Sequence, residues 1–159
     1  MKRKIITSDD GSHTIYVPEL KEHYHSTFGA ISESMHIFIN EGFNCIDSDE
    51  INILEIGFGT GLNAVLTYTE ALKAMKKVNF YTIEKYPLIK EEWEKLNYFK
   101  LIPGVNKKLF RIFHDSEWEK WIEINDHFKL FKTRRDIKTF QPDRQYDLVY
   151  FDAFAPDIQ

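Results

Sequence analysis

The sequence predicts an α/β fold in which a parallel sheet carries a ligand site at the carboxyl ends of its strands. Three features of residues 51–67 lead to this prediction. Residues 51–56 are rich in Ile and Leu, as in a parallel strand buried on both faces. Three glycines at alternate positions follow, and glycine allows positive φ and a close approach of ligand to backbone. From Leu62 onward, apolar residues recur at helical spacing. Strand, glycine turn and helix form the first unit of a nucleotide-binding α/β fold.

Composition narrows the class of protein. With 159 residues the chain is long enough for one domain with a real core, and its aromatic fraction of 15% argues against disorder. The net charge of −4 gives no global basic field, so any RNA contact needs a local patch. Cys45 is the only cysteine, which excludes an internal disulfide and fits a reducing cytoplasm. No apolar run approaches the ~18 residues of a membrane span, and the basic start lacks the apolar core of a signal peptide.

Residues 1–50 are predicted to form an extension made of a β-hairpin and a helix. Strands at residues 5–7 and 13–17 flank a polar turn that contains glycine, which is the pattern of a hairpin. Ser26 is then the expected N-cap of a helix that runs from Thr27 to about Asn40.

After the first helix, residues 78–83 are expected to form a second strand, which ends in Glu84. An acid at this tip commonly accepts hydrogen bonds from both ribose hydroxyls of a nucleoside, because a carboxylate can accept two at once. NAD sites use the same device, so Glu84 indicates adenosine binding without selecting the cofactor. Pro87 occupies the expected first position of the next helix. The apolar face of that helix is made by Ile89, Trp93 and Leu96.

A further short helix and a third strand are expected next. Ser116 opens a capping-box pattern, which predicts a helix that carries Trp118 and Trp121. Residues 127–135 have the pattern of the third strand, and Asp136 lies just beyond it. Asp136 either faces the adenine amino group or is a solvated acid beside two neighbouring arginines, and the sequence does not choose between these interpretations.

The fourth strand, residues 146–151, is the most apolar in the chain and ends in Asp152. An acid at this tip lies beside the switch point, where open α/β sheets bind ligands.

The glycine turn itself indicates a class of cofactor. Glu55 stands two residues before the first glycine, giving the arrangement E-x-G-x-G-x-G. A dinucleotide fingerprint requires its third glycine at position 62, which is Leu62. The arrangement resembles motif I of the class I S-adenosylmethionine-dependent methyltransferases. A sulfonium ligand is cationic and has no pyrophosphate, so a carboxylate beside the glycines suits it. A dinucleotide site and a turn that merely packs helix on strand are the alternatives.

Three motifs extend this resemblance to one family. Residues 54–63, 82–87 and 151–156 resemble the methyltransferase domain of the bacterial tRNA 5-methylaminomethyl-2-thiouridine methyltransferases. Residues 10–14 and 23–26 resemble stand-alone members that lack the oxidase domain. The resemblance implies a Rossmann-like class I methyltransferase sheet with strand order 3-2-1-4 and S-adenosyl-L-methionine as the cofactor. It also implies methylation of the exocyclic amine of 5-aminomethyl-2-thiouridine at the wobble position of tRNA, in the cytoplasm.

Residue roles follow from the same resemblance. Asp152 is the expected catalytic acid or base. The expected cofactor-binding residues are Glu55, Gly57, Phe58, Gly59, Thr60, Gly61, Asn63, Glu84, Lys85, Asp136 and Asp152. The expected substrate-binding residues are His23, Tyr24, His25 and Phe154.

The paired histidines allow other interpretations. His23 and His25 would share one face of a strand and bind a metal there, but no third ligand is evident and no metal is expected. In the other interpretations, the two histidines form hydrogen bonds with the cofactor tail or with substrate, or they belong to an ordinary polar lid.

Class I methyltransferases continue for three more strands after the fourth. Residues 51–159 are therefore expected to be an incomplete domain, apparently truncated after the fourth strand. Residues 148–151 would then form an unprotected apolar edge, which predicts self-association. A related aminopropyltransferase-like enzyme and a non-catalytic cofactor-binding fragment are the alternative functions.

Basic residues suggest where tRNA phosphates would bind, although such clusters are more often solvated faces. They are Lys107, Lys108, Arg111, Lys132, Arg134 and Arg135.

Overall fold

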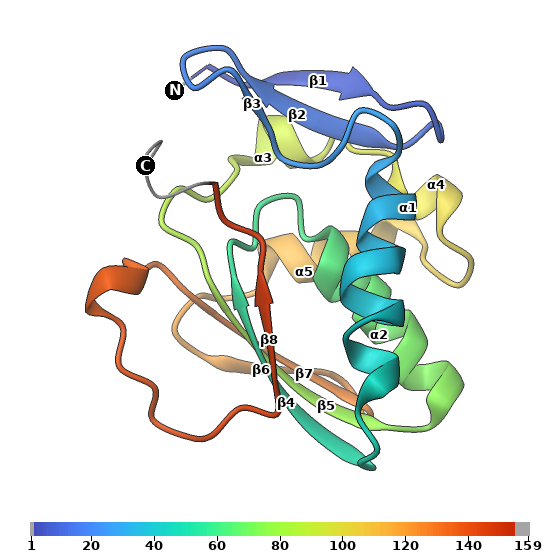
Figure 1. The fold of residues 1–159 in the computed structure, drawn as a ribbon, viewed down its shortest axis with the longest axis vertical. Helices are drawn as coiled ribbons and strands as arrows, with labels where there is room; N and C mark the ends of the chain where they lie inside the picture. Colours follow the sequence, from blue (N-terminus) through green and yellow to red (C-terminus); the bar gives the residue numbers. More distant parts are fainter. Residues whose placement is uncertain (1, 155–159) are drawn as a thin grey trace.

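The computed structural model describes residues 2–154 and contains two sheets (Figure 1). The larger sheet has five strands in the order β6-β7-β5-β4-β8. These strands are β4 (Glu50–Ile56), β5 (Lys77–Ile83), β6 (Trp121–Asn125), β7 (Phe128–Thr133) and β8 (Leu148–Phe151). β4 runs parallel to β5 and β8, and β5 runs parallel to β7, whereas β6 is antiparallel to β7. The predicted α/β class with a parallel sheet is confirmed. The four expected strands, β4, β5, β7 and β8, lie in the order 3-2-1-4.

The central strands are buried on both faces, as the Ile- and Leu-rich run of β4 predicts. Ile53 and Phe80 lie in the main core, where helices cover the sheet. Their neighbours Leu54 and Tyr81 point to the other face, into a smaller apolar cluster with Phe131. Because side chains alternate between faces, each central strand contributes to both cores.

The helices are short except for α2 and α5. They are α1 (Ala30–Ser34), which continues as a π-helical segment (Met35–Asn40), α2 (Leu62–Ala74), α3 (Lys90–Trp93), α4 (Tyr98–Leu101) and α5 (Lys107–Asp115). Two 3₁₀ turns lie at Phe43–Cys45 and Ile137–Thr139. The helix predicted after the glycine turn is confirmed as α2, and it lies beside α1 on one face of the sheet (Figure 1). In the described part of the chain, residues 2–154, no helix is long and apolar enough to cross a membrane.

The smaller sheet is antiparallel and has the order β1-β2-β3. Its strands are β1 (Lys4–Thr7), β2 (His13–Val17) and β3 (Glu22–His23). The predicted hairpin is confirmed, and β3 adds a third strand to it. This sheet lies over the carboxyl ends of the main strands (Figure 1), so the amino-terminal segment takes part in the region where the ligand site is expected.

The turn of the hairpin caps α1, which corrects the predicted start of this helix. Backbone N–H groups of the first turn donate to side chains of the hairpin turn: Ala30 to Ser8 Oγ (3.3 Å), Ile31 to Ser12 Oγ (3.2 Å) and Ser32 to Asp10 Oδ2 (3.0 Å). The helix therefore begins at Ala30 and not at Thr27, and Ser26 is not its N-cap. Local sequence suggested Ser26, but the groups that satisfy the free N–H groups come from a turn about twenty residues earlier.

The prediction of a helix after Ser116 is wrong, because this segment leads into strand β6. Glu119 has φ 60°, which interrupts a helix, and its N–H donates to Lys132 O over 2.8 Å. Trp121 then pairs with Phe131 in the antiparallel β6–β7 ladder. The capping-box pattern is a local signal, and pairing with an adjacent strand overrides it.

The helix predicted from Pro87 begins three residues later, at Lys90. Arg3 Nη2 donates to Tyr86 O over 2.7 Å and its Nη1 donates to Pro87 O over 3.4 Å, and the backbone of Ile89 is extended (φ −79°, ψ 163°). Ile89 consequently lies outside the helix and is 58% exposed, whereas Trp93 is buried as expected.

Candidate functional site

A cavity of about 360 Å³ lies at the carboxyl ends of β4, β5 and β8, against Leu20, Tyr24 and His25 of the amino-terminal segment. Gly57 and Gly59 of the glycine turn line it, as do the two strand-tip acids, Glu84 and Asp152. Because parallel strands end at one edge, residues far apart in sequence meet in this cavity. The strand pattern alone predicted this meeting of the turn and the acids.

The glycine turn has backbone conformations that favour glycine. Gly57 has φ +95°, and a Cβ there would lie 2.7 Å from Asp152 O. Gly59 has φ +49°, and a Cβ there would lie 3.1 Å from the ring of Tyr24. The absence of side chains at these two positions brings β4 close to the end of β8 and leaves the turn backbone open to the cavity.

Glu84 is fixed at the tip of β5 by backbone donors. Gly59 N donates to its Oε2 over 2.9 Å, and Tyr86 N donates to its Oε1 over 2.7 Å. Each oxygen keeps a second lone pair for a ligand. The carboxylate therefore lies in the cavity wall in a defined orientation and can accept further hydrogen bonds.

Asp152 is held at the tip of β8 and titrates near neutral pH. Its N–H donates to Ile56 O over 2.9 Å, and Asn63 Nδ2 donates to its Oδ2 over 2.8 Å. Burial raises the pKa of Asp152 to about 7, and the nearby carboxylates of Glu33 and Glu84 also raise it, while the Asn63 hydrogen bond lowers it. An acid with this pKa can both accept and release a proton under physiological conditions.

Glu55 lies beneath the turn and does not line the cavity. Thr82 Oγ1 donates to its Oε2 over 2.7 Å, and its Oε1 is buried without a hydrogen-bond partner in the described chain. Burial raises the pKa of Glu55 to about 8. The acid of the E-x-G-x-G-x-G arrangement is therefore close to the glycines, as expected, but it is largely uncharged at neutral pH.

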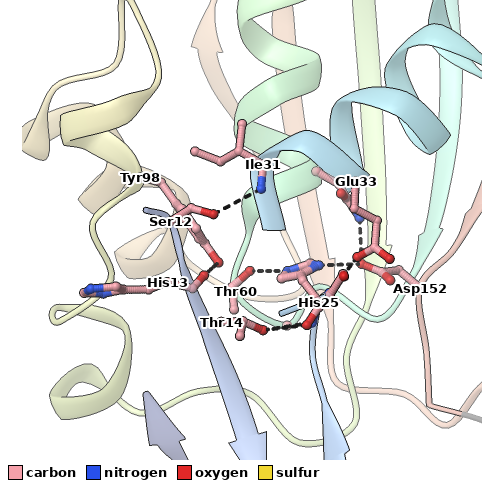
Figure 2. Close-up of polar contacts among 12 residues, drawn as sticks. Ser12, His13, Thr14, His25, Ile31, Glu33, Thr60, Tyr98 and Asp152 are labelled. Atoms are coloured by element: carbon pink, nitrogen blue, oxygen red, sulfur yellow. Dashed lines mark hydrogen bonds and ion pairs between the residues drawn. The ribbon is translucent and has the colours of Figure 1, made fainter. Parts of the chain in front are cut away.

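Two histidines hold Thr60 of the turn, one at its hydroxyl and the other at its carbonyl oxygen. His25 Nε2 is 2.8 Å from Thr60 Oγ1 (Figure 2), and His114 Nε2 is 3.0 Å from Thr60 O. Burial lowers the pKa of His25 to about 4 and that of His114 to about 3, and Lys132 contributes to the second shift. Both rings are therefore neutral. Sequence reasoning missed His114, because its helix α5 was not predicted.

The rim of the cavity carries an ion pair between Lys85 and Asp136. Lys85 Nζ is 2.9 Å from Asp136 Oδ2, and Asp136 Oδ1 also accepts a hydrogen bond from Lys138 N. Asp136 is thus partnered by Lys85 and not by the neighbouring arginines. Both residues line the cavity, and a contact of Asp136 with adenine stays a prediction.

The expected substrate-binding residues separate into two places. Tyr24, His25 and Phe154 line the cavity. The rings of Tyr24 and Phe154 pack edge-on, with their centroids 5.2 Å apart. Burial raises the pKa of Tyr24 to about 12, so its hydroxyl stays protonated. His23 is outside the cavity lining and packs against Tyr16, with ring centroids 4.7 Å apart.

The two histidines do not share a strand, because β3 ends at His23. Within residues 2–154, no group of three His, Cys, Asp or Glu side chains is placed to hold a metal ion.

The remaining predicted residues are structural or peripheral in this arrangement. Phe58 is buried and packs edge-on to His114 and Trp118. Lys132, one of the candidate phosphate contacts, is fully buried and its Nζ donates to the backbone oxygens of Phe113 and His114. Lys132 is therefore unavailable to a phosphate.

Comparison with known proteins finds similarity to proteins whose names refer to tRNA 5-methylaminomethyl-2-thiouridine biosynthesis. The tRNA 5-methylaminomethyl-2-thiouridine biosynthesis bifunctional protein MnmC of Leptospira interrogans is 30% identical over 146 residues, which are 84% of this chain and 23% of that protein. The protein of the same name from Cupriavidus metallidurans is 32% identical over 101 residues, 58% of this chain and 14% of that protein. The crystal structure of MnmC2 from Aquifex aeolicus matches with a TM-score of 0.73 and 26% identity, over 98% of this chain and 50% of that chain. No family model matches.

The chain thus spans about a quarter of the first of these curated relatives and half of the solved structure. These matches confirm the resemblance that the three sequence motifs indicated.

Proposed function

The chain is a homologue of the MnmC proteins over part of their length, and we propose from this that it is a methyltransferase that modifies the wobble uridine of tRNA. In detail, we infer that it uses S-adenosylmethionine to methylate the exocyclic amine of 5-aminomethyl-2-thiouridine. The printed name of the relatives contains the methylated form of this nucleoside, which supports the assignment.

The structural observation that supports this proposal most directly is the position of Asp152 in the wall of the cavity, where its pKa is raised to about 7. An alkylated amine must lose a proton, and an acceptor with a pKa near the working pH is suited to take it. Asn63 orients the carboxyl by donating to Oδ2. Asp152 is thus proposed to accept the proton of the acceptor amine or to orient that amine.

The residues around the cavity fit S-adenosylmethionine. The turn at Gly57 and Gly59 leaves backbone open, and Glu84 presents lone pairs suited to the two ribose hydroxyls. When bound, this cofactor supplies a methyl group on a positively charged sulfur. The carboxylate of Glu84 in the cavity wall, and that of Asp152 when it is ionised, provide a negative environment for such a charge. The protein's further contribution is to hold the reacting groups in line.

The test is methyl transfer to defined acceptors. An anticodon stem-loop carrying 5-aminomethyl-2-thiouridine is incubated with the chain and methyl-labelled S-adenosylmethionine, beside a stem-loop with unmodified uridine and beside spermidine. Label in the aminomethyl stem-loop alone is expected. Asp152→Asn is expected to lose about 10²-fold or more in rate, while Asp126→Asn in the exposed β6–β7 turn behaves as wild type. Transfer to spermidine instead, or no binding of the cofactor, overturns the proposal.

A further inference from the structure

His25 joins three parts of the site that are far apart in the sequence (Figure 2). It follows β3 of the amino-terminal sheet, its Nε2 meets Thr60 of the glycine turn at 2.8 Å, and its Nδ1 faces Asp152 Oδ2 at 3.8 Å. Its side chain is only 5% exposed. We propose that His25 is a positioning residue, which holds the glycine turn through Nε2 and orients Asp152 through Nδ1. The proposal rests on the proposed role of Asp152 and deepens it.

The backbone of His25 is locked before its ring acts. His25 N donates to Thr14 Oγ1 over 2.9 Å, and Thr14 Oγ1 donates to His25 O over 3.0 Å. The adjoining start of β2 is clamped in turn, because Tyr98 Oη donates to His13 O over 2.6 Å. The ring thus projects from a rigid support, and the amino-terminal sheet becomes a structural component of the site.

The surroundings select one tautomer of the neutral ring. Nδ1 faces an acceptor oxygen of Asp152, which is favourable when Nδ1 carries the proton. Nε2 then accepts from the hydroxyl of Thr60. Burial keeps the ring neutral across the physiological range, because it lowers the pKa of His25 to about 4.

A neutral ring matters for the charge of Asp152. The ionisable groups around its carboxyl are His25 after β3, Glu33 on α1, Glu84 after β5, Glu55 on β4 and Tyr98 on α4. A cationic imidazole in this place would stabilise the carboxylate and lower the pKa of Asp152. A neutral Nδ1–H gives the carboxyl a direction without adding that charge, so the acid keeps a pKa suited to proton transfer.

This role differs from the substrate contact expected from the sequence. Both ring nitrogens of His25 are directed at protein atoms, at Thr60 and at Asp152. A residue that binds substrate would instead present a polar atom to the cavity. The two assignments make different predictions for the same pair of variants.

The experiment uses His25→Gln and His25→Asn as complementary variants. The Gln amide reaches the position of Nε2 and retains the bond to Thr60, whereas the Asn amide reaches the position of Nδ1 and retains the group that faces Asp152. His25→Asn is expected to weaken binding of S-adenosylmethionine about tenfold, the value of one net hydrogen bond, without moving the acidic limb of the pH–rate profile. His25→Gln is expected to bind the cofactor almost as wild type and to move that limb to higher pH by up to about one unit, because the Nδ1–H dipole that faces the carboxylate at 3.8 Å is lost.

A readout that needs no catalysis accompanies these assays. In ¹⁵N NMR of the wild-type chain, His25 is expected to show a protonated Nδ1 and a bare Nε2 without titration from pH 5.5 to 8, since its pKa lies at about 4. His36→Gln, at an exposed position outside the cavity lining, is the control and behaves as wild type in every assay.

Two results would overturn the proposal: a bare Nδ1, or variants that change only KM for the RNA. Absence of methyl transfer by the wild type refutes the proposed function instead, and the NMR result then decides the tautomer by itself.

Discussion

Replacing Gly57 by alanine tests whether the glycine turn and the end of β8 are packed as tightly as the structure shows. A Cβ at Gly57 would lie 2.7 Å from O and 3.0 Å from C of Asp152. Both backbones are held in place, because Gly57 N donates to Ile83 O over 2.8 Å and Asp152 N donates to Ile56 O over 2.9 Å. The clash is with backbone atoms, so no side-chain rotation relieves it.

Gly104 provides a matched control. It also has positive φ, +81°, but nothing lies within 4 Å of the Cβ position. Alanine at either site should cost about 1–2 kcal/mol for the left-handed backbone conformation. Only Gly57→Ala should add about 1–3 kcal/mol for overpacking. The free energy of unfolding is therefore expected to fall by roughly 1–2 kcal/mol in Gly104→Ala and by roughly 2–5 kcal/mol in Gly57→Ala.

Urea unfolding of both variants, with the slope m compared to detect changes in the unfolded state, measures the difference. Because relief of the clash displaces Asp152, Gly57→Ala should also lose binding of S-adenosylmethionine, which calorimetry measures, while Gly104→Ala retains it. Equal destabilisation of the two variants would show that the turn and the β8 end are not in contact, and would refute the reasoning.

Three further predictions concern buried or hydrogen-bonded charges, each measured as the free energy of unfolding against pH. Asp10→Ala removes a cap of α1 and should cost about 1 kcal/mol. Burial raises the pKa of Asp10, but hydrogen bonds from neighbouring serines outweigh this and hold the pKa well below its usual range. The destabilisation by Asp10→Ala should therefore be largest above about pH 4 and should decline as pH falls. A destabilisation that does not change with pH would contradict this prediction.

Burial lowers the pKa of Lys132 to about 8. Between pH 8 and about 10.4 the unfolded chain therefore binds more protons at this residue than the folded chain does. The free energy of unfolding of the wild type, relative to that of Lys132→Met, should consequently rise across this window. Burial raises the pKa of Glu55 to about 8, so the unfolded chain binds fewer protons from about pH 4.3 upward. Glu55→Gln should therefore gain stability relative to wild type as pH rises toward 8, and a loss would contradict the burial argument.

The central sheet could be predicted because its signals are local. The Ile- and Leu-rich run of β4, the alternate glycines and the apolar start of α2 are consecutive, and each agrees with the next. The tip acids Glu84 and Asp152 were found by their position after a strand. Parallel topology then brings them to one edge without any knowledge of contacts.

The mispredicted elements have determinants that are distant in sequence. The start of α1 depends on the hairpin turn around Asp10, and the extended segment at Pro87 depends on Arg3. Strand β6 forms because Trp121 pairs with Phe131 on strand β7. The capping-box pattern at Ser116 contains no information about this pairing. In each case a tertiary partner satisfies backbone groups that local reasoning assigned to a neighbour.

The chemical state of the site could not be predicted for the same physical reason. Glu55 and Asp152 are both acids beside the glycine turn, and their order in the sequence says nothing of their protonation. Burial raises the pKa of both, because desolvation disfavours the carboxylate. That burial depends in part on the amino-terminal segment, where Tyr24 and His25 line the same cavity as Asp152. A motif thus identifies which residues lie near the ligand site, whereas their charge depends on burial to which the amino-terminal segment contributes.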